Sequence, residues 1–418
     1  MAITGSRAHV FGWLAKIAAA GCALINTRLL FELLGTTPFA AFSIIIAMGP
    51  WLALMQLGLA GASQNAISAR RAAGADLAAF SRSATTLAMT VWVLMTGVAC
   101  LLSVPMKAWT LNGYAWVPIT AILLMFAGML STAVSAIFNQ MLLALDQPLW
   151  PNVAPGIQAF ATTLALLAAR WIQPTDSFMV AAVAFAAPML LTTVISSALC
   201  GSFDGWQIRK RDARELMLSC RGFMLFAVAS TATLSADMLI LSQLLEAHEI
   251  ATYSLVSRII GVMLSLHGVV LANAWPKLAV QHAAGKRDEF MQQLRSTLGL
   301  GAITTVLPTA ILLMAGDLVF SALGASALTP VNPTTLIAGF AYLCVRVWTD
   351  SFAVALLSTG RALALGSFVV VQMLVSVTAQ WLLASRYGAA GAFAGIAVSF
   401  LLTAAWIIPH QVLRRKTA

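Results

Sequence analysis

The 418-residue chain is 60% hydrophobic and only 9% charged, and its mean hydropathy is +0.90. A soluble domain carries roughly 25% charged residues, so this composition excludes a soluble enzyme, a disordered chain and a secreted disulfide scaffold. The net charge of +10 would suggest a nucleic-acid partner for a soluble protein. Membrane proteins instead hold Lys and Arg on cytoplasmic loops, so we expect no nucleic-acid partner here.

Twelve stretches are long and apolar enough to cross a bilayer, which needs about 20 mostly apolar residues. They lie at roughly 9–34, 39–65, 84–104, 117–140, 153–172, 178–200, 218–245, 251–275, 294–316, 333–358, 364–385 and 391–410. The longest polar stretch between them is 201–217. The sequence therefore predicts an all-α polytopic membrane protein. Its two pseudo-symmetric six-helix lobes, 1–200 and 218–418, would be joined by a cytoplasmic linker, 201–217, and would surround a central cavity.

The distribution of Lys and Arg tests this map of spans. With the N-terminus in the cytoplasm, the predicted cytoplasmic segments hold 16 Lys and Arg residues and the outer loops hold only Lys107, Arg170 and Arg386. This asymmetry follows the positive-inside rule. It predicts a multi-pass protein of the bacterial inner membrane with both termini in the cytoplasm.

The two predicted lobes resemble each other in sequence. A shift of 211 residues places 26–74 on 237–285 without a gap, so that Leu33-Leu34 meets Leu244-Leu245 and Ser43 meets Ser254. Because each lobe has an even number of spans, the repeat is parallel, as in many transporters whose substrate path lies between two halves.

Charged residues inside the predicted spans are candidates for function, since a charge in hydrocarbon is costly. We identified two acids, Asp237 and Asp350, and five cations, Lys16, Arg28, Arg221, Arg258 and Arg346. Lys16 and Arg221 lie near the cytoplasmic ends of their spans, so an equally good interpretation is that their side chains extend to the interface. Arg346 and Asp350 share a helix face and could be a self-neutralising pair or a substrate site with a coupling acid.

Arg28, Asp237 and Arg258 each lie about ten residues from the outer turn of a hairpin, roughly 15 Å along a helix. The sequence predicts that Asp237 and Arg258 pair at equal depth on neighbouring helices. The pair could be purely structural, or it could couple an ion to transport.

Three uncharged polar residues are candidates for lining the cavity: Asn26, the repeat mate of Asp237, and Gln56 and His267, which are mates of each other. A lone histidine in a span is more often packed and hydrogen-bonded than a proton carrier. Gly391 and Gly395 form a GxxxG motif that predicts close helix packing. Pro50, Pro188 and Pro308 predict kinks or broken helices.

No catalytic or metal-binding constellation is present in the sequence. There is no GxxxxGK[ST] loop, no HExxH, no GxSxG and no Cys/His cluster, so we expect a transporter without cofactor or metal rather than an enzyme. The free energy would come from an H+ or Na+ gradient, from the substrate gradient, or from consumption of the product.

Several segments resemble the Wzx-type polysaccharide-unit flippase family of the multidrug/oligosaccharidyl-lipid/polysaccharide (MOP) exporter superfamily. The resemblance covers the full length of the chain and its layout of twelve spans. It rests on 28–30, 33–35 and 56–59 in the first half and on 236–241, 250–258, Pro276 and 283–285 in the second. The family usually has Asp where Gln56 stands.

The resemblance implies two six-helix lobes around a cavity that opens to one side at a time. Its usual cargo is a short oligosaccharide on undecaprenyl pyrophosphate, used for O-antigen, capsule or exopolysaccharide. The implied partners are this lipid-linked oligosaccharide, membrane lipids and a polysaccharide polymerase. The surplus of intramembrane cations independently suits an anionic head group, because guanidinium groups can bind phosphate oxygens in pairs.

Other functions remain open at this stage. A multidrug exporter of the MATE kind would use intramembrane carboxylates, and we found no acid in the first six predicted spans. A lipid II flippase normally has two further spans. A membrane-embedded transferase would need paired catalytic acids or a His/Asp site, and a scaffold would not need buried cations in both halves.

Overall fold

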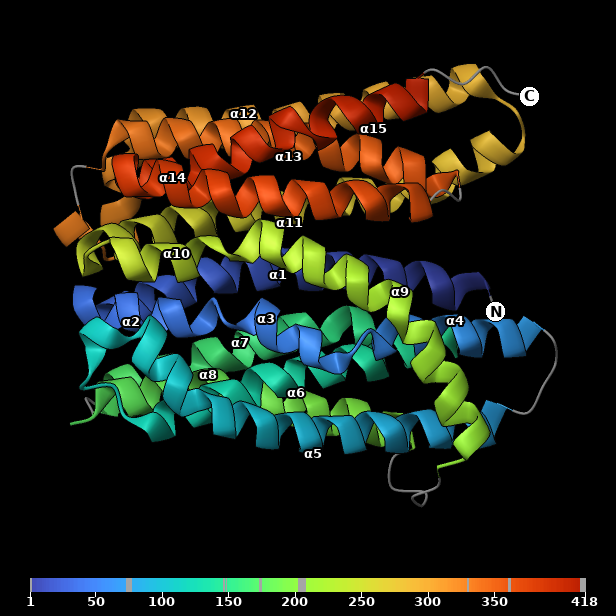
Figure 1. The fold of residues 1–418 in the computed structure, drawn as a ribbon, viewed down its shortest axis with the longest axis horizontal. Helices are drawn as coiled ribbons and strands as arrows, with labels where there is room; N and C mark the ends of the chain where they lie inside the picture. Colours follow the sequence, from blue (N-terminus) through green and yellow to red (C-terminus); the bar gives the residue numbers. More distant parts are fainter. Residues whose placement is uncertain are drawn as a thin grey trace. The chain divides into compact units, whose positions relative to one another are not determined.

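The computed structural model describes residues 2–72, 77–145, 147, 149–172, 175–201, 208–328, 331–359 and 362–413. Regular structure in these ranges is entirely helical. The chain forms two compact units, Met1–Val228 and Ala229–Ala418. In each unit the long helices run side by side (Figure 1). Helices suit an apolar chain of this kind because they satisfy every interior backbone N–H and C=O without water.

Eleven helical segments of the described chain are long and apolar enough to cross a membrane. The last of them, Val369–Leu413, contains a turn at Gly388 and therefore holds more than one helix. The expected all-α multi-pass membrane fold is confirmed.

Unit 1 is built from helices whose order follows the predicted spans. They are α1 (Ala2–Leu34), α2 (Thr36–Ile46), α3 (Gly49–Ala53), the 3-10 helix η1 (Leu54–Gln56), α4 (Leu59–Ala72), α5 (Leu77–Thr110), η2 (Asn112–Tyr114), α6 (Ile119–Ala144), α7 (Leu149–Ile172), α8 (Ser177–Leu199) and the first part of α9 (Lys210–Ser235).

Helix α6 is the central helix of unit 1, where it packs against α3, α4, α5 and α8. Its Ile137 and Phe138 are fully buried and share a core with Phe80 of α5 and Leu216 of α9. On the other side, α1 lies along α7, and a side chain added at Gly156 of α7 would meet the backbone oxygen of Ala15 at 2.9 Å. Glycine at this position permits the close approach of the two helices.

The second predicted span is broken twice. Helix α2 ends at Ile46, and α3 begins at Gly49 with Pro50 in its first turn. The chain then turns again at Leu57 and Gly58, whose φ angles are 57° and 77°. Pro50 thus marks a break, as predicted. Pro188 and Pro308 instead lie within α8 and α12, which continue through them.

Unit 2 contains the rest of α9 and the helices that follow. These are α10 (Asp237–Leu244), α11 (Ala247–Ala283), α12 (Arg287–Ala322), the 3-10 helix η3 (Ser326–Leu328), α13 (Pro333–Ser358), α14 (Ala362–Leu402) and α15 (Ala404–Leu413). Helix α13 packs against α11, α12, α14 and α15 and is the central helix of this unit.

Helix α14 is a hairpin of two helices joined at Gly388, where φ is +59°. A Cβ atom at Gly391 would lie 2.0 Å from the backbone oxygen of Leu383, and one at Gly395 would lie 2.5 Å from the Cα of Gln380. The two glycines therefore face the helix before the turn, and the close packing predicted from the GxxxG motif is confirmed.

Helix boundaries keep the 211-residue register of the sequence repeat. Helix α2 begins at Thr36 and α11 begins at Ala247, and α4 ends at Ala72 whereas α11 ends at Ala283, so both boundaries are 211 residues apart. The breaks differ between the halves. The α2–α4 segment is interrupted whereas α11 is continuous, and α1 is continuous whereas α9 and α10 are separated at Ala236.

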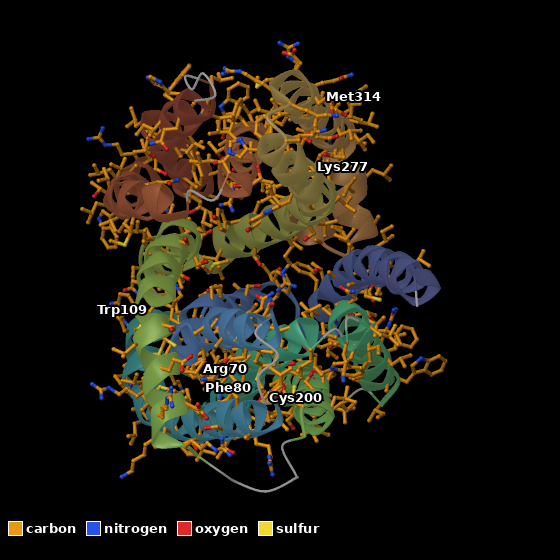
Figure 2. All side chains as sticks on the ribbon, turned by 90° about the vertical axis from the view of Figure 1, so that its right-hand side faces the viewer. Arg70, Phe80, Trp109, Cys200, Lys277 and Met314 are labelled. Carbon is orange, nitrogen blue, oxygen red and sulfur yellow. The ribbon has the colours of Figure 1, made fainter. Side chains whose placement is uncertain are left out.

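The division between the units falls within α9, after Val228. Of the predicted linker 201–217, residues 202–207 lie outside the described residues, and α9 begins at Lys210. The start of α9 belongs to unit 1 and packs on its other helices. The guanidinium of Arg70 binds Asp212 at 3.3 Å and Glu215 at 2.8 Å and lies 3.6 Å from the ring centroid of Phe80 (Figure 2).

The hairpin in α14 gives a prediction about stability. Gly391→Ala places a methyl group against the backbone of Leu383, so it should destabilise the protein by roughly 1–3 kcal/mol. Gly299→Ala is the matched control, because a Cβ at Gly299 of α12 has no neighbour within 4 Å. Thermal unfolding of the purified protein in detergent would measure both, and equal midpoints for the two variants would contradict the packing described.

Candidate functional site

Asp237 lies where the chain breaks between α9 and α10. One carboxylate oxygen accepts a hydrogen bond from the backbone N–H of Met238 at 2.8 Å, and the other accepts one from the hydroxyl of Tyr253 on α11. Tyr253 is only 1% exposed. The break thus places an acid at the first turn of α10, where the helix dipole favours a negative charge.

The predicted pair of Asp237 with Arg258 is not among the ion pairs of the described residues, and Tyr253 is the partner from α11 instead. The reason is the position of the turn. Helix α10 gives way to α11 at Leu245, which is eight residues from both Asp237 and Tyr253, whereas Arg258 is thirteen residues away. Arg258 lies farther along α11, partly buried, and has contacts of its own.

An aromatic stack connects Asp237 to the centre of unit 2. The ring of Phe393 from α14 lies between Tyr253 and Tyr342, with centroid distances of 4.4 Å and 6.2 Å. Tyr342 precedes Arg346 by one turn of α13. The stack therefore runs from Tyr253, which contacts Asp237, to Tyr342, which lies beside Arg346 of the Arg346–Asp350 ion pair.

Arg346 and Asp350 form the ion pair that their spacing predicts. The Nε atom of Arg346 donates to Asp350 at 2.8 Å, and the guanidinium lies 5.4 Å from the ring centroid of Phe400. The two side chains are 20% and 29% exposed, so part of each is accessible. The pair neutralises itself, and the guanidinium of Arg346 is also hydrogen-bonded to the side chain of Tyr342.

His267 of α11 packs against α12 and α13. It is 1% exposed, its Nε2 atom lies 3.3 Å from the hydroxyl of Ser351 on α13, and its ring lies against Gly301 of α12. Its Nδ1 atom has no hydrogen-bond partner in the described part of the chain. These contacts match the packed and hydrogen-bonded interpretation of this histidine.

Arg28 in unit 1 belongs to a cluster of three charges. Its Nε atom donates to Glu32 at 2.7 Å, and the other carboxylate oxygen of Glu32 accepts from Arg170 of α7 at 2.9 Å. Arg28 lies six residues from the end of α1 at Leu34, so it is nearer the helix end than the ten residues predicted. The helix stops at Leu34 because Gly35 takes a φ of +74°.

The prediction that the first six spans contain no acid is wrong. Glu32 lies within the predicted span 9–34 and inside α1. Arg170, which was expected in an outer loop, lies in the last turn of α7. The i, i+4 spacing of Arg28 and Glu32 was the available signal for their pairing. Nothing in the sequence indicated that α7 would bring Arg170 to the same carboxylate.

Asn26 and Gln56 do not share one site. The Asn26 side chain, 9% exposed, donates to the backbone oxygen of Ala159 at 3.3 Å and links α1 to α7. Gln56 lies at the end of η1 and lines a cavity of about 370 Å³ between the broken segment, α6 and α8. Gln56 and Thr132 are the polar side chains of that otherwise apolar lining. The side chains of Lys16 and Arg221 lie outside the described residues.

The five cysteines are free thiols, and Cys200 and Cys220 are the buried ones. Cys200, which caps the end of α8, donates to the backbone oxygen of Phe138 (3.4 Å). Within the described ranges, no three His, Cys, Asp or Glu side chains are close enough together to hold a metal ion.

No family model matches the chain. A protein of Salmonella typhi named "Putative O-antigen transporter" is 25% identical over 412 residues, which cover 95% of this chain and 93% of that protein. The solved structure of the lipid II flippase MurJ in an inward closed conformation has a TM-score of 0.77 at 12% identity and covers 97% of this chain and 88% of that one.

An inward-facing multidrug resistance MATE family transporter of the MOP superfamily has a TM-score of 0.70 at 11% identity, with 94% of each chain covered. The chain has the fold of MOP-superfamily transporters. The structural matches establish this fold over nearly the whole length. The arginine–carboxylate pairs and the Asp237–Tyr253 contact described above are therefore features of this chain within that fold.

The Asp237–Tyr253 contact can be tested by removing one hydroxyl group. Tyr253→Phe leaves a buried carboxylate oxygen without its donor, which costs about 1–3 kcal/mol. We expect a lower thermal midpoint and less folded protein in the membrane. Tyr387→Phe removes a hydroxyl from a side chain that is 65% exposed and should change neither quantity. Equal stability of the two variants would show that the contact contributes nothing.

Proposed function

We propose that the protein is a flippase that moves undecaprenyl-pyrophosphate-linked oligosaccharide units across the bacterial inner membrane by alternating access. The observation that carries the proposal is similarity over 95% of the chain to a relative named for O-antigen transport. The fold likeness to a lipid II flippase supports the same class of cargo, a saccharide on a lipid pyrophosphate. The units would serve O-antigen, capsule or exopolysaccharide synthesis.

The charges of both units suit such a cargo. A pyrophosphate cannot cross bare hydrocarbon, because its desolvation cost is far above thermal energy. We propose that Arg28 in unit 1 and Arg258 and Arg346 in unit 2 replace its water by charge-assisted hydrogen bonds. Arg28 and Arg346 each bind a carboxylate through Nε, and the Nη groups of Arg28 then remain for phosphate oxygens.

A MATE-like multidrug exporter is the second candidate, favoured by the TM-score of 0.70 to such a transporter. The acid found in unit 1, Glu32, does not strengthen it, because two arginines already neutralise that carboxylate. The flippase is the better supported function, because its evidence includes a full-length sequence relative as well as the fold.

Energy coupling and partners complete the proposal. Transport would draw on H+ or Na+, or on consumption of the flipped unit by a polysaccharide polymerase. With the turn at Gly388 counted as a turn between two passes, the chain would cross the membrane twelve times with both termini in the cytoplasm.

Export in a strain lacking the chromosomal copy tests the arginines. Arg28→Ala should reduce surface polysaccharide roughly tenfold or more, since one hydrogen bond to a charged group contributes about 1.5–3 kcal/mol. Arg28→Lys keeps the charge without the paired donors and should retain partial export. Arg386→Ala removes an exposed arginine at the end of the first helix of α14 and serves as control. Full export by a well-expressed Arg28→Glu, Arg258→Ala variant would overturn the cationic route.

Membrane topology is a separate prediction. Reporter fusions after Thr175 and after Leu413 should lie on opposite sides of the membrane, the first outside and the second in the cytoplasm. The reason is the excess of Lys and Arg in the segments assigned to the cytoplasm. Both reporters on the same side would contradict the count of twelve passes.

A further inference from the structure

Glu32 is bound by two arginines from two helices. Arg28 donates through Nε to one of its carboxylate oxygens, and Arg170 donates through Nη1 to the other. The three side chains together carry a net charge of +1. Arg28 is 51% exposed, Arg170 is 57% exposed and Glu32 is 22% exposed. The cluster is therefore open on the side of its cations.

Most donors of this cluster are unused. Arg28 has two Nη groups, and Arg170 has Nε and Nη2, for which no described residue is an acceptor. A guanidinium edge with two N–H groups matches the spacing of phosphate oxygens. Two such edges held by one carboxylate could bind two phosphate groups of one ligand.

The position of the cluster indicates the depth of that ligand. Glu32 lies two residues from the end of α1, and Arg170 lies two residues from the end of α7. The next residue of α7, Trp171, is 87% exposed, as is typical of a tryptophan at a membrane–water interface. Lipid phosphates lie at this level of a bilayer.

The shared carboxylate changes the cost of releasing an arginine. If a phosphate takes Arg28 from a simple pair, the carboxylate loses its counter-ion in a poorly solvating environment. Here Glu32 keeps Arg170. Asp350 has no second arginine of this kind among its described ion pairs, so the corresponding exchange at Arg346 would cost more.

We propose that Arg28 and Arg170 bind the pyrophosphate of a polyprenyl-linked saccharide at the membrane interface, with Glu32 as the positioning residue. Glu32 holds both guanidinium groups when the site is empty, yields Arg28 to the pyrophosphate, and retakes it when the cargo leaves. This inference rests on the proposed flippase function and adds Glu32 and Arg170 to it.

Binding to the full-length protein in phosphatidylcholine nanodiscs tests the inference, with undecaprenyl pyrophosphate as probe. Glu32→Gln should tighten binding about two- to fivefold, the range of a partly exposed ion pair, because the competing carboxylate is gone. Arg170→Gln should weaken binding by a similar factor, since Glu32 is then left to Arg28 alone. The loss should be smaller in the Glu32→Gln background.

Three controls separate positioning from folding. Glu32→Asp keeps the carboxylate and should stay close to the wild type, and Arg170→Lys should recover part of the lost affinity. Arg386→Gln removes one exposed arginine elsewhere and should leave affinity unchanged. A merely structural role for Glu32 predicts a lower thermal midpoint and weaker binding in Glu32→Gln, which is the opposite sign and would overturn the inference.

Binding and competition experiments with three other ligands identify the chemical group that the site recognises. Undecaprenol, which has the tail without the charge, should bind more weakly and should not respond to Glu32→Gln. Inorganic pyrophosphate should compete with the probe, and phosphatidylglycerol should compete poorly. Equal competition by phosphatidylglycerol would mean a general lipid-phosphate site and would overturn the assignment.

Export distinguishes this inference from the proposed function. Glu32→Gln should slow export at unchanged protein level, because the cargo leaves less readily. If Arg28→Ala abolishes export while Glu32→Gln alters neither binding nor export, the role of Glu32 is wrong and the flippase stands. If Arg28→Glu, Arg258→Ala exports fully, the cationic route itself fails.

Discussion

Hydrocarbon solvates neither an unpaired charge nor an unpaired peptide group, and the rest of this structure depends on that constraint. It requires helices throughout the apolar stretches, and it requires partners for the charges within them. The partners are found in each unit. Glu32 is shared by two arginines, Asp350 binds Arg346 four residues earlier, and Asp237 binds a tyrosine hydroxyl and a backbone N–H. Each of these acids accepts hydrogen bonds from its partners, and Arg28 and Arg170 keep unused donors.

Helix interruptions place several of these groups. The separation of α9 from α10 at Ala236 puts Asp237 in a first turn, where its carboxylate accepts the N–H of Met238. The breaks in the α2–α4 segment put Gln56 on a mostly apolar cavity. Because the breaks fall in different members of the repeat, the two halves share their helix boundaries but carry different chemistry at equivalent positions. The shared helix boundaries thus supply the frame, and local backbone departures supply the differences.

The MOP fold is compatible with both drug export and lipid flipping, so the fold alone does not decide between them. The distinction depends on charge. A carboxylate that two guanidinium groups neutralise is poorly placed to bind a cationic drug, whereas arginines with unused Nη groups suit phosphate. Glu32 illustrates how misleading a residue count can be, since the acid in the first helix belongs to an arginine cluster rather than to a cation-binding site.

Periodicity, composition and spacing determined the membrane class, the helix order, the GxxxG packing and the Arg346–Asp350 pair, because these depend on contacts close in sequence or on the hydrophobic thickness of a bilayer. Tertiary structure decided which distant side chains meet. Arg170 reaches Glu32 only because α7 lies along α1, and Tyr253 rather than Arg258 meets Asp237 because the turn falls at Leu245. A shift of a few residues in a turn moves a side chain by more than the length of a hydrogen bond, and sequence patterns do not locate turns that closely.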